Sequence, residues 1–204
     1  MEELELAYEL VMLPFPPRAL KRSYLTINPL GTIPLLLDGE TRITESAAAT
    51  QYLCARAGPT SLQVGADEQD FGAYLNYLHF GEATLTFPLT LVLRYSRFET
   101  GARRQPQVSE DYARWFLARL RTLEPRLATH AYLCADRFTA ADISVGYALL
   151  LAQHLDMTDQ FPPAVKAYWE RLFQRSAFLR SMEAQHKAAV EQGVSTVPAP
   201  DTTP

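Results

Sequence analysis

The clearest pattern of apolar and polar positions lies between Asn28 and Leu53, where it predicts a loop, two short strands and a helix. The predicted elements are a buried strand over 34–37, a second strand over 41–43 and a helix over 47–57. Asp38-Gly39 between the strands is a strong hairpin signal, because glycine adopts positive φ without steric cost. Glu45-Ser46 opens the helix, and Gly58-Pro59 ends it.

On either side of this stretch the periodicity differs. Tyr8 to Leu13 is apolar and β-prone, and it predicts another strand. Apolar residues after Asp67 recur at helical spacing, and they predict helices over 68–95 with a bend at Pro88, over 110–129 with Ser109 as its cap, from Thr139 onward, over 164–174 and over 177–190. The predicted domain organisation is therefore 1–59 as an α+β domain, 60–67 as a linker, 68–190 as an all-α domain and 191–204 as a disordered tail.

The helix that follows Thr139 has a defined start. Thr139 is a good N-cap, and Asp142 three residues later can return a hydrogen bond to it, as in a capping box. Phe138 and Ile143 stand where a hydrophobic staple would lie. The pattern predicts a helix that begins just after Thr139.

Composition and charge exclude several function classes. The chain of 204 residues carries a net charge of −4 and no run of five like charges, which argues against nucleic-acid binding through phosphates. The acidic N-terminus is unlike a signal peptide, and no apolar run reaches the length of a membrane span. Four scattered histidines predict no metal site. Two cysteines, Cys54 expected to be buried and Cys134 expected in a more exposed turn, favour the reducing cytoplasm.

Taken together, Asn28-Pro29, Gly31, Ile33-Pro34, Asp38-Gly39 and Glu45-Ser46 resemble, in order, the glutathione-binding half of a bacterial-type glutathione transferase. The Thr-x-x-Asp helix start in the second half is also similar to that family, and the resemblance runs from about Leu4 to Val190. It implies a thioredoxin-like N-terminal domain, here truncated, followed by an all-helical C-terminal domain. It also implies a homodimer, with glutathione as co-substrate.

The resemblance also implies a glutathione site. In the family the peptide before Pro34 is cis, and Ile33 offers its N–H and C=O to the cysteine part of glutathione, as an added strand would. Glu45 and Ser46 lie at the start of a helix, where N–H groups and the helix dipole favour a carboxylate, here that of the γ-glutamyl group. The alternative from the residues alone is that Glu45-Ser46 only initiates a helix.

One part of the family pattern has no counterpart in this chain. The first strand and most of the first helix of the thioredoxin-like domain are missing, and the catalytic Ser, Tyr or Cys of the family follows that strand. No residue matches it, so the predicted catalytic set is empty. Either the printed start is internal to a longer protein, or the chain is genuinely shortened. The first is favoured, because losing an inner strand leaves unpaired backbone groups.

Three functions follow from these observations. The first is a transferase that conjugates the glutathione thiolate to an apolar electrophile. The alternative is a non-catalytic binding or scaffold protein on the same fold, because the catalytic segment is absent. A thiol-disulfide oxidoreductase ranks third, since no Cys-x-x-Cys motif is present.

Overall fold

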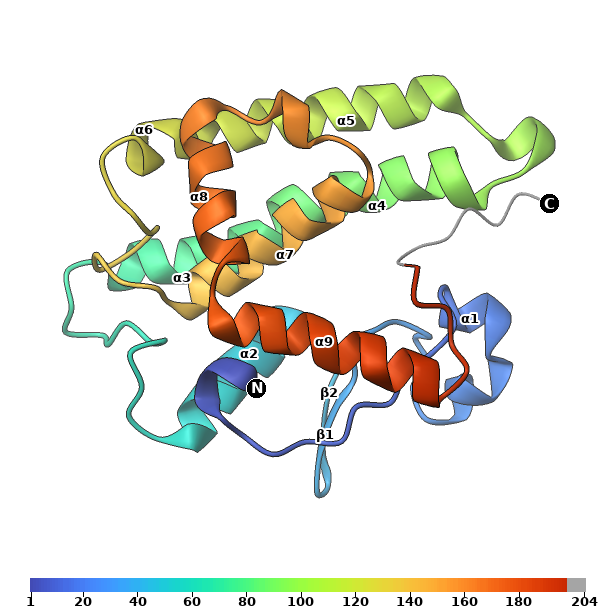
Figure 1. Cartoon of the computed structure of the whole chain (residues 1–204), viewed down its shortest axis with the longest axis horizontal. Helices are drawn as coiled ribbons and strands as arrows, with labels where there is room; N and C mark the ends of the chain where they lie inside the picture. Colours follow the sequence, from blue (N-terminus) through green and yellow to red (C-terminus); the bar gives the residue numbers. More distant parts are fainter. Residues whose placement is uncertain (198–204) are drawn as a thin grey trace. The chain divides into compact units, whose positions relative to one another are not determined.

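A computed structural model describes residues 1–197, which form two units (Figure 1). The first unit contains Met1–Pro59 and the segment that begins at Gln174, and the second contains Thr60–Phe173. Residues 198–204, the second half of the tail predicted to be disordered, lie outside the described residues.

The last helix, α9 (Ser176–Glu191), belongs to the first unit, whereas the sequence-based division placed it in the helical domain. Two ion pairs tie its start to the first residues of the chain. Arg175 Nε lies 2.8 Å from Glu3 Oε1, and Arg180 Nε lies 3.0 Å from Glu2 Oε2. Contacts so far apart in sequence could not be read from local periodicity.

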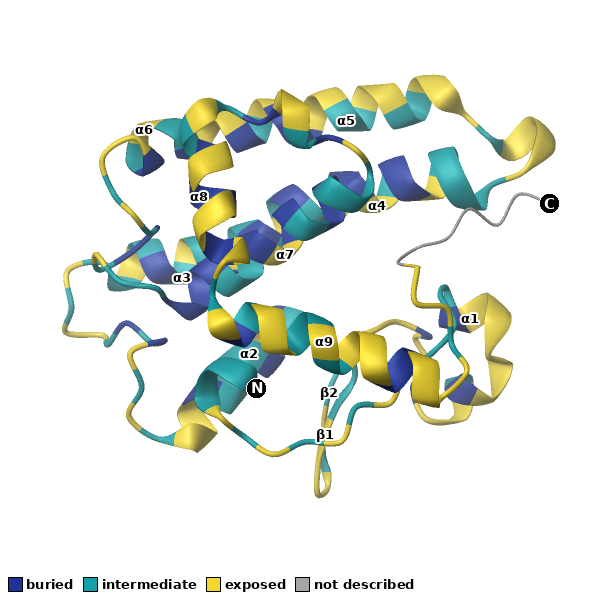
Figure 2. Ribbon diagram, in the orientation of Figure 1, coloured by how far each residue is buried: buried dark blue, intermediate teal, exposed yellow. Residues whose placement is uncertain are grey.

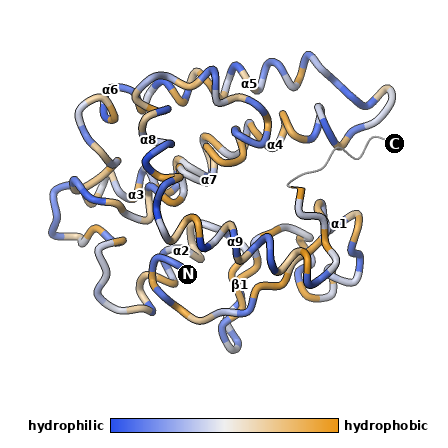
Figure 3. Tube along the Cα trace, viewed as in Figure 1, coloured by the Kyte–Doolittle hydropathy of each residue, from blue (hydrophilic) through white to orange (hydrophobic). Residues whose placement is uncertain are grey.

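A β-hairpin is the only sheet among the described residues. Strand β1 (Leu36–Asp38) pairs antiparallel with β2 (Thr41–Ile43), and Leu36 lies opposite Ile43. Gly39 in the turn has φ 57°, which confirms the hairpin predicted from Asp38-Gly39. Figure 3 shows the hydropathy changing from hydrophobic strand to hydrophilic turn along this hairpin. Leu37 is 53% exposed, so the expectation of a buried strand is wrong for a sheet of only two strands.

The predicted strand over 8–13 is also wrong. Residues 6–14 are neither helix nor strand, and β1 and β2 pair only with each other in the described part of the chain. A β-prone sequence forms a strand only when a neighbour completes its backbone hydrogen bonds. The remaining short elements of the unit are η1 (Glu2–Leu4), α1 (Pro17–Leu20) and η2 (Arg22–Thr26).

The second unit is helical throughout, as predicted. Its elements in chain order are α3 (Phe71–His79), η3 (Phe80–Thr86), α4 (Phe87–Leu93), η4 (Arg94–Phe98), η5 (Gly101–Arg103), α5 (Pro106–Leu120), η6 (Arg121–Leu123), α6 (Glu124–Leu127), α7 (Ala140–His154), η7 (Thr158–Gln160) and α8 (Pro163–Phe173). Helix α7 forms the core of this unit, since most of its residues are buried (Figure 2) and α3, η3, α4 and α8 pack on it.

The long helix predicted over 68–95 is a chain of helical segments, with a π-helical stretch, η3, just before Pro88. Proline has no N–H and its ring clashes with the carbonyl four residues earlier, so the wider π turns accommodate it. Gly81 lets this helix approach α7 closely, because a Cβ there would lie 2.4 Å from Ser144 Oγ. Ser144 in turn donates a 2.7 Å hydrogen bond to the Leu78 carbonyl.

Two helix starts test the capping predictions. The box at Thr139 is confirmed, because the Thr139 amide donates to Asp142 Oδ2 at 2.8 Å and α7 begins at Ala140. The predicted cap at Ser109 is wrong, since α5 already begins at Pro106. Proline is favoured at the first helical position, where its missing N–H costs nothing.

Candidate functional site

The loop that leads into β1 carries the first pair of predicted site residues. The Ile33–Pro34 peptide is cis, as the sequence led us to expect, and Ile33 is 46% exposed. Gly31 makes the preceding turn with φ 63°, and a Cβ on it would come within 2.7 Å of Arg18 Cβ. Only glycine fits this position without a rearrangement, so the path into Ile33 is closely specified.

The side chains of Tyr24 and Asn28 form hydrogen bonds to the backbone of this loop. The Tyr24 hydroxyl donates to the Thr32 carbonyl at 2.8 Å, and Asn28 Nδ2 donates to the same oxygen at 2.9 Å. From the sequence, Asn28 was expected only as part of the Asn28-Pro29 loop motif of the family, and Tyr24 was given no role in the site. The spacing of four residues between them, one helical turn, is the signal that could have paired them.

The second predicted pair lies at the start of α2 (Ser46–Ala57). Glu45 is the N-cap residue in an extended conformation, and its carbonyl accepts the Ala49 amide at 2.9 Å. Its carboxylate is exposed, and Ser46 is half-buried as the first helical residue. The first turn of a helix carries a partial positive charge, so an anionic group is stabilised beside Ser46.

The hairpin brings the two pairs to the same end of the sheet. Leu36 pairs with Ile43, so the residues before β1 and those after β2 both lie at the open end, away from the Gly39 turn. Ile33-Pro34 enters that end and Glu45-Ser46 leaves it. The exposed residue Ile33 and the N-terminus of α2 therefore adjoin the same end of the hairpin, which suits a ligand with a peptide-like part and a carboxylate.

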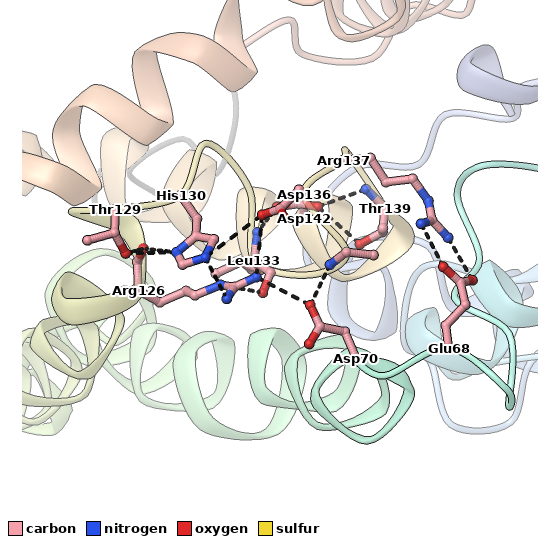
Figure 4. A network of polar contacts seen from close by, with 11 residues as sticks. Glu68, Asp70, Arg126, Thr129, His130, Leu133, Asp136, Arg137, Thr139 and Asp142 are labelled. Atoms are coloured by element: carbon pink, nitrogen blue, oxygen red, sulfur yellow. Dashed lines mark hydrogen bonds and ion pairs between the residues drawn. The ribbon is translucent and has the colours of Figure 1, made fainter.

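A second polar cluster lies in the helical unit, around the loop before α7 (Figure 4). Asp142 accepts four hydrogen bonds, from the Leu133 amide, the Tyr168 hydroxyl, and the amide and hydroxyl of Thr139. A carboxylate offers about four acceptor positions, so Asp142 has no capacity left for a ligand. Burial raises the pKa of this carboxyl, with the hydrogen bonds opposing that shift.

The other acids of the cluster are also paired within the chain. Arg137 forms a fork on Glu68, with its two terminal nitrogens 2.8 Å from the two carboxylate oxygens. Asp70 accepts the Ala135 amide at 2.7 Å and Arg126 at 3.3 Å (Figure 4). This cluster fixes a loop and a helix start, and we assign it to stability rather than to ligand binding.

Comparison with known proteins identifies the family of this chain. A model of the glutathione S-transferase N-terminal domain matches residues 1–61, and one of the C-terminal domain matches residues 92–176. "Probable glutathione S-transferase GSTF2" of Oryza sativa subsp. japonica is 30% identical over 182 residues, covering 86% of this chain and 84% of the relative. The chain belongs to the glutathione S-transferase family.

Other members of the family are similarly related. "Glutathione S-transferase 3" of Zea mays is 29% identical over 201 residues, covering 90% of this chain and 86% of that relative. The transferase URE2P6 of Phanerochaete chrysosporium, solved in complex with oxidized glutathione, superposes with a TM-score of 0.78 at 25% identity, over 92% of this chain and 88% of that one. The fold is therefore a small thioredoxin-like domain with a two-stranded sheet, followed by a helical domain. These relatives favour a transferase-like function over the non-catalytic alternative.

The two thiols of this transferase-family chain are not reactive groups. Cys54 is 1% exposed and burial raises its pKa, as expected for a structural thiol. Cys134 was expected to be exposed, but it is fully buried, and burial raises its pKa to about 12. Thiolate is the reactive form, so neither cysteine serves as a nucleophile near neutral pH.

No group of three or more His, Cys, Asp or Glu side chains in residues 1–197 could hold a metal ion. Within the same range, no helix combines the length and the apolar character that crossing a bilayer requires.

Proposed function

We propose that this protein binds glutathione at the open end of the hairpin and conjugates the glutathione thiolate to a small apolar electrophile. The observation that carries the proposal is the hairpin register, which brings Ile33-Pro34 and Glu45-Ser46 to one end of the sheet. Membership of the family supplies the identity of the ligand.

Each residue has a chemical role in this proposal. The backbone N–H and C=O of Ile33 pair with the cysteine part of glutathione, and the bend at Pro34 directs them outward. Ser46 and the first turn of α2 bind the γ-glutamyl carboxylate, and the exposed Glu45 carboxylate binds the neighbouring ammonium. A single helix start thus receives both charges of the γ-glutamyl end.

The transfer step needs little from the protein beyond binding and orientation. The glutathione sulfur forms a bond to the electrophilic carbon, the leaving group departs with the bonding electrons, and the thiol proton passes to solvent. No side chain of this chain is assigned to activate the sulfur, and the buried thiols of Cys54 and Cys134 are excluded by their raised pKa values.

A calorimetric titration with glutathione tests whether the protein binds glutathione as proposed. Ser46→Ala removes one hydrogen bond to a charged group, so we expect roughly tenfold weaker binding at an unchanged melting temperature. Ser176→Ala is the matched control, because Ser176 is likewise the first residue of a helix and is likewise followed by alanine. Equal affinity in the two variants would contradict the role of Ser46.

The catalytic half needs a separate assay with 1-chloro-2,4-dinitrobenzene, an apolar aryl electrophile. We expect the conjugate to form faster with the protein than without it, and Ser46→Ala to lower the rate at subsaturating glutathione. Binding without any acceleration would show that this chain holds glutathione but is not a transferase.

We further propose that the protein works as a homodimer, as the family resemblance implies, and that it is located in the cytoplasm. The content of two cysteines, both buried and free, fits a reducing compartment. Light scattering coupled to gel filtration tests the assembly, and a mass close to 22.9 kDa would contradict it.

A further inference from the structure

Asn28 is an unusual residue in the N-terminal unit. It is 2% exposed, and it is the one non-aromatic polar side chain buried in the described part of that unit. A buried amide without partners is costly, so its contacts identify what the position is for.

The hydrogen bonds of Asn28 converge on one turn. Its Nδ2 donates to the Thr32 carbonyl at 2.9 Å and lies 3.3 Å from the Tyr24 hydroxyl, while its Oδ1 accepts the Leu30 amide at 3.1 Å. The Tyr24 hydroxyl donates to the same Thr32 carbonyl at 2.8 Å. One backbone oxygen therefore receives two donors, as many as its two lone pairs can accept.

The orientation of that carbonyl fixes the orientation of its neighbour. The Thr32 C=O and the Ile33 N–H belong to the same planar peptide, and in a trans peptide they point in opposite directions. Cis bonds in the chain occur before Pro16 and Pro34, so the Thr32–Ile33 peptide is trans. With the carbonyl held toward Tyr24 and Asn28, the Ile33 N–H must point away from them.

We propose that Tyr24 and Asn28 are positioning residues for glutathione binding, because together they lock the Thr32–Ile33 peptide with the Ile33 N–H facing the ligand. This inference rests on the proposed function and adds to it a pair of residues that never touch the ligand. The carbonyl end of this peptide meets the buried Asn28 side chain, and the residue that carries its N–H, Ile33, is 46% exposed.

Tyr24→Phe is the decisive variant, because it keeps the ring and removes only the donor. We expect glutathione to bind about fivefold more weakly, since one hydrogen bond no longer holds the peptide. In the conjugation assay the KM for glutathione should rise by a similar factor, with kcat and the KM for the electrophile unchanged. A purely structural role would lower the active fraction, and hence the apparent kcat, without changing the KM for glutathione.

Tyr52→Phe is the matched control. The Tyr52 hydroxyl donates to Asp38 Oδ2 at 2.7 Å in the same unit, beside the turn end of the hairpin. This substitution also removes one tyrosine hydrogen bond, but it leaves the Thr32–Ile33 peptide untouched, so glutathione binding should match the wild type.

Asn28→Asp provides a second variant of nearly the same shape. Its carboxylate cannot donate to the Thr32 carbonyl and repels it, so we expect a loss of affinity larger than that of Tyr24→Phe. If wild-type protein binds glutathione and both variants bind it equally well, this inference is wrong while the proposed function stands. If wild-type protein does not bind glutathione, the proposed function itself is wrong, and the positioning role falls with it.

Discussion

The two units of the molecule contain the same kind of hydrogen-bonded cluster, which serves a different purpose in each. In each, a tyrosine hydroxyl meets a buried polar side chain that holds a loop: Tyr24 with Asn28 in the first unit, and Tyr168 with Asp142 in the second. In the helical unit the bonds end on a carboxylate that has no acceptor position left. In the thioredoxin-like unit they end on a backbone carbonyl, whose partner N–H is thereby presented outward.

This difference separates a stabilising cluster from a binding one. The Asp142 carboxylate has no acceptor position left for a ligand, so its substitution should lower only the stability of the fold. The Asn28 cluster also stabilises its loop, but its loss should be felt in glutathione binding as well. The contrast can be tested by substitutions of matched chemistry in the two units.

The largest effect is expected at Asp142. Asp142→Ala leaves two amides and two hydroxyls of the core without their acceptor, so we expect a loss of roughly 3–5 kcal/mol in the free energy of unfolding. Urea denaturation measures it, with the exposed Asp111→Ala as control, for which we expect less than about 1 kcal/mol. The folded fraction of Asp142→Ala should bind glutathione with wild-type affinity. A marginal change in stability would show that the carboxylate is not the centre of this cluster.

Gly31→Ala should have a smaller effect on stability but a clear one on binding. The new Cβ clashes with Arg18 and the backbone has positive φ, so we expect a loss of about 2–4 kcal/mol and weaker binding of glutathione. Gly39→Ala has a similar φ but no atom within 4 Å of the new Cβ, so it should cost only about 1–2 kcal/mol. Urea midpoints that coincide for the two variants would rule out the close packing around Gly31.

The smallest effect is expected on the pH dependence of stability, through the Glu68–Arg137 pair of the helical unit. The hydrogen bonds from Arg137 lower the pKa of Glu68 to about 2, below its ordinary value of 4.5. The unfolded chain therefore takes up the proton first, and this contribution to stability is lost as the pH falls from 4.5 towards 2. Glu68→Gln should make the urea midpoint fall less steeply over that range.

The pKa of Asp142 is shifted in the opposite direction, so its contribution to stability changes with pH in the opposite sense to that of Glu68. Because burial raises its pKa, the folded state takes up that proton first, and stability from this group rises as the pH falls through the window above its unfolded pKa. If the urea midpoint of Glu68→Gln changes with pH as the wild-type midpoint does, the pair with Arg137 does not perturb the pKa of Glu68.

Local chemistry made part of this structure predictable. The hairpin at Asp38-Gly39 and the capping box at Thr139 depend on residues within a few positions of each other, and both were read correctly. Features that depend on distant partners were misread. Tyr8 to Leu13 has no strand to pair with among the described residues, and the turn at the buried Cys134 is tied by the Ala135 amide to Asp70, 65 residues away.

The candidate site shows the same limit. The residue types at Ile33-Pro34 and Glu45-Ser46 marked a site through a family resemblance, and the cis peptide was anticipated in the same way. The orientation of the Thr32–Ile33 peptide depends on donors from Tyr24 and Asn28, which no pattern of hydrophobicity records. Their roles became visible only through the hydrogen bonds of the folded loop.

The central claim is that glutathione binds at the open end of the hairpin and not at the polar cluster of the helical unit. Amide hydrogen exchange of the wild-type protein, with and without saturating glutathione, tests it most directly. We predict slower exchange in peptides that cover residues 28–49, and no change in peptides that cover residues 131–142. Protection confined to 131–142, or no protection in 28–49 at saturation, would contradict the account.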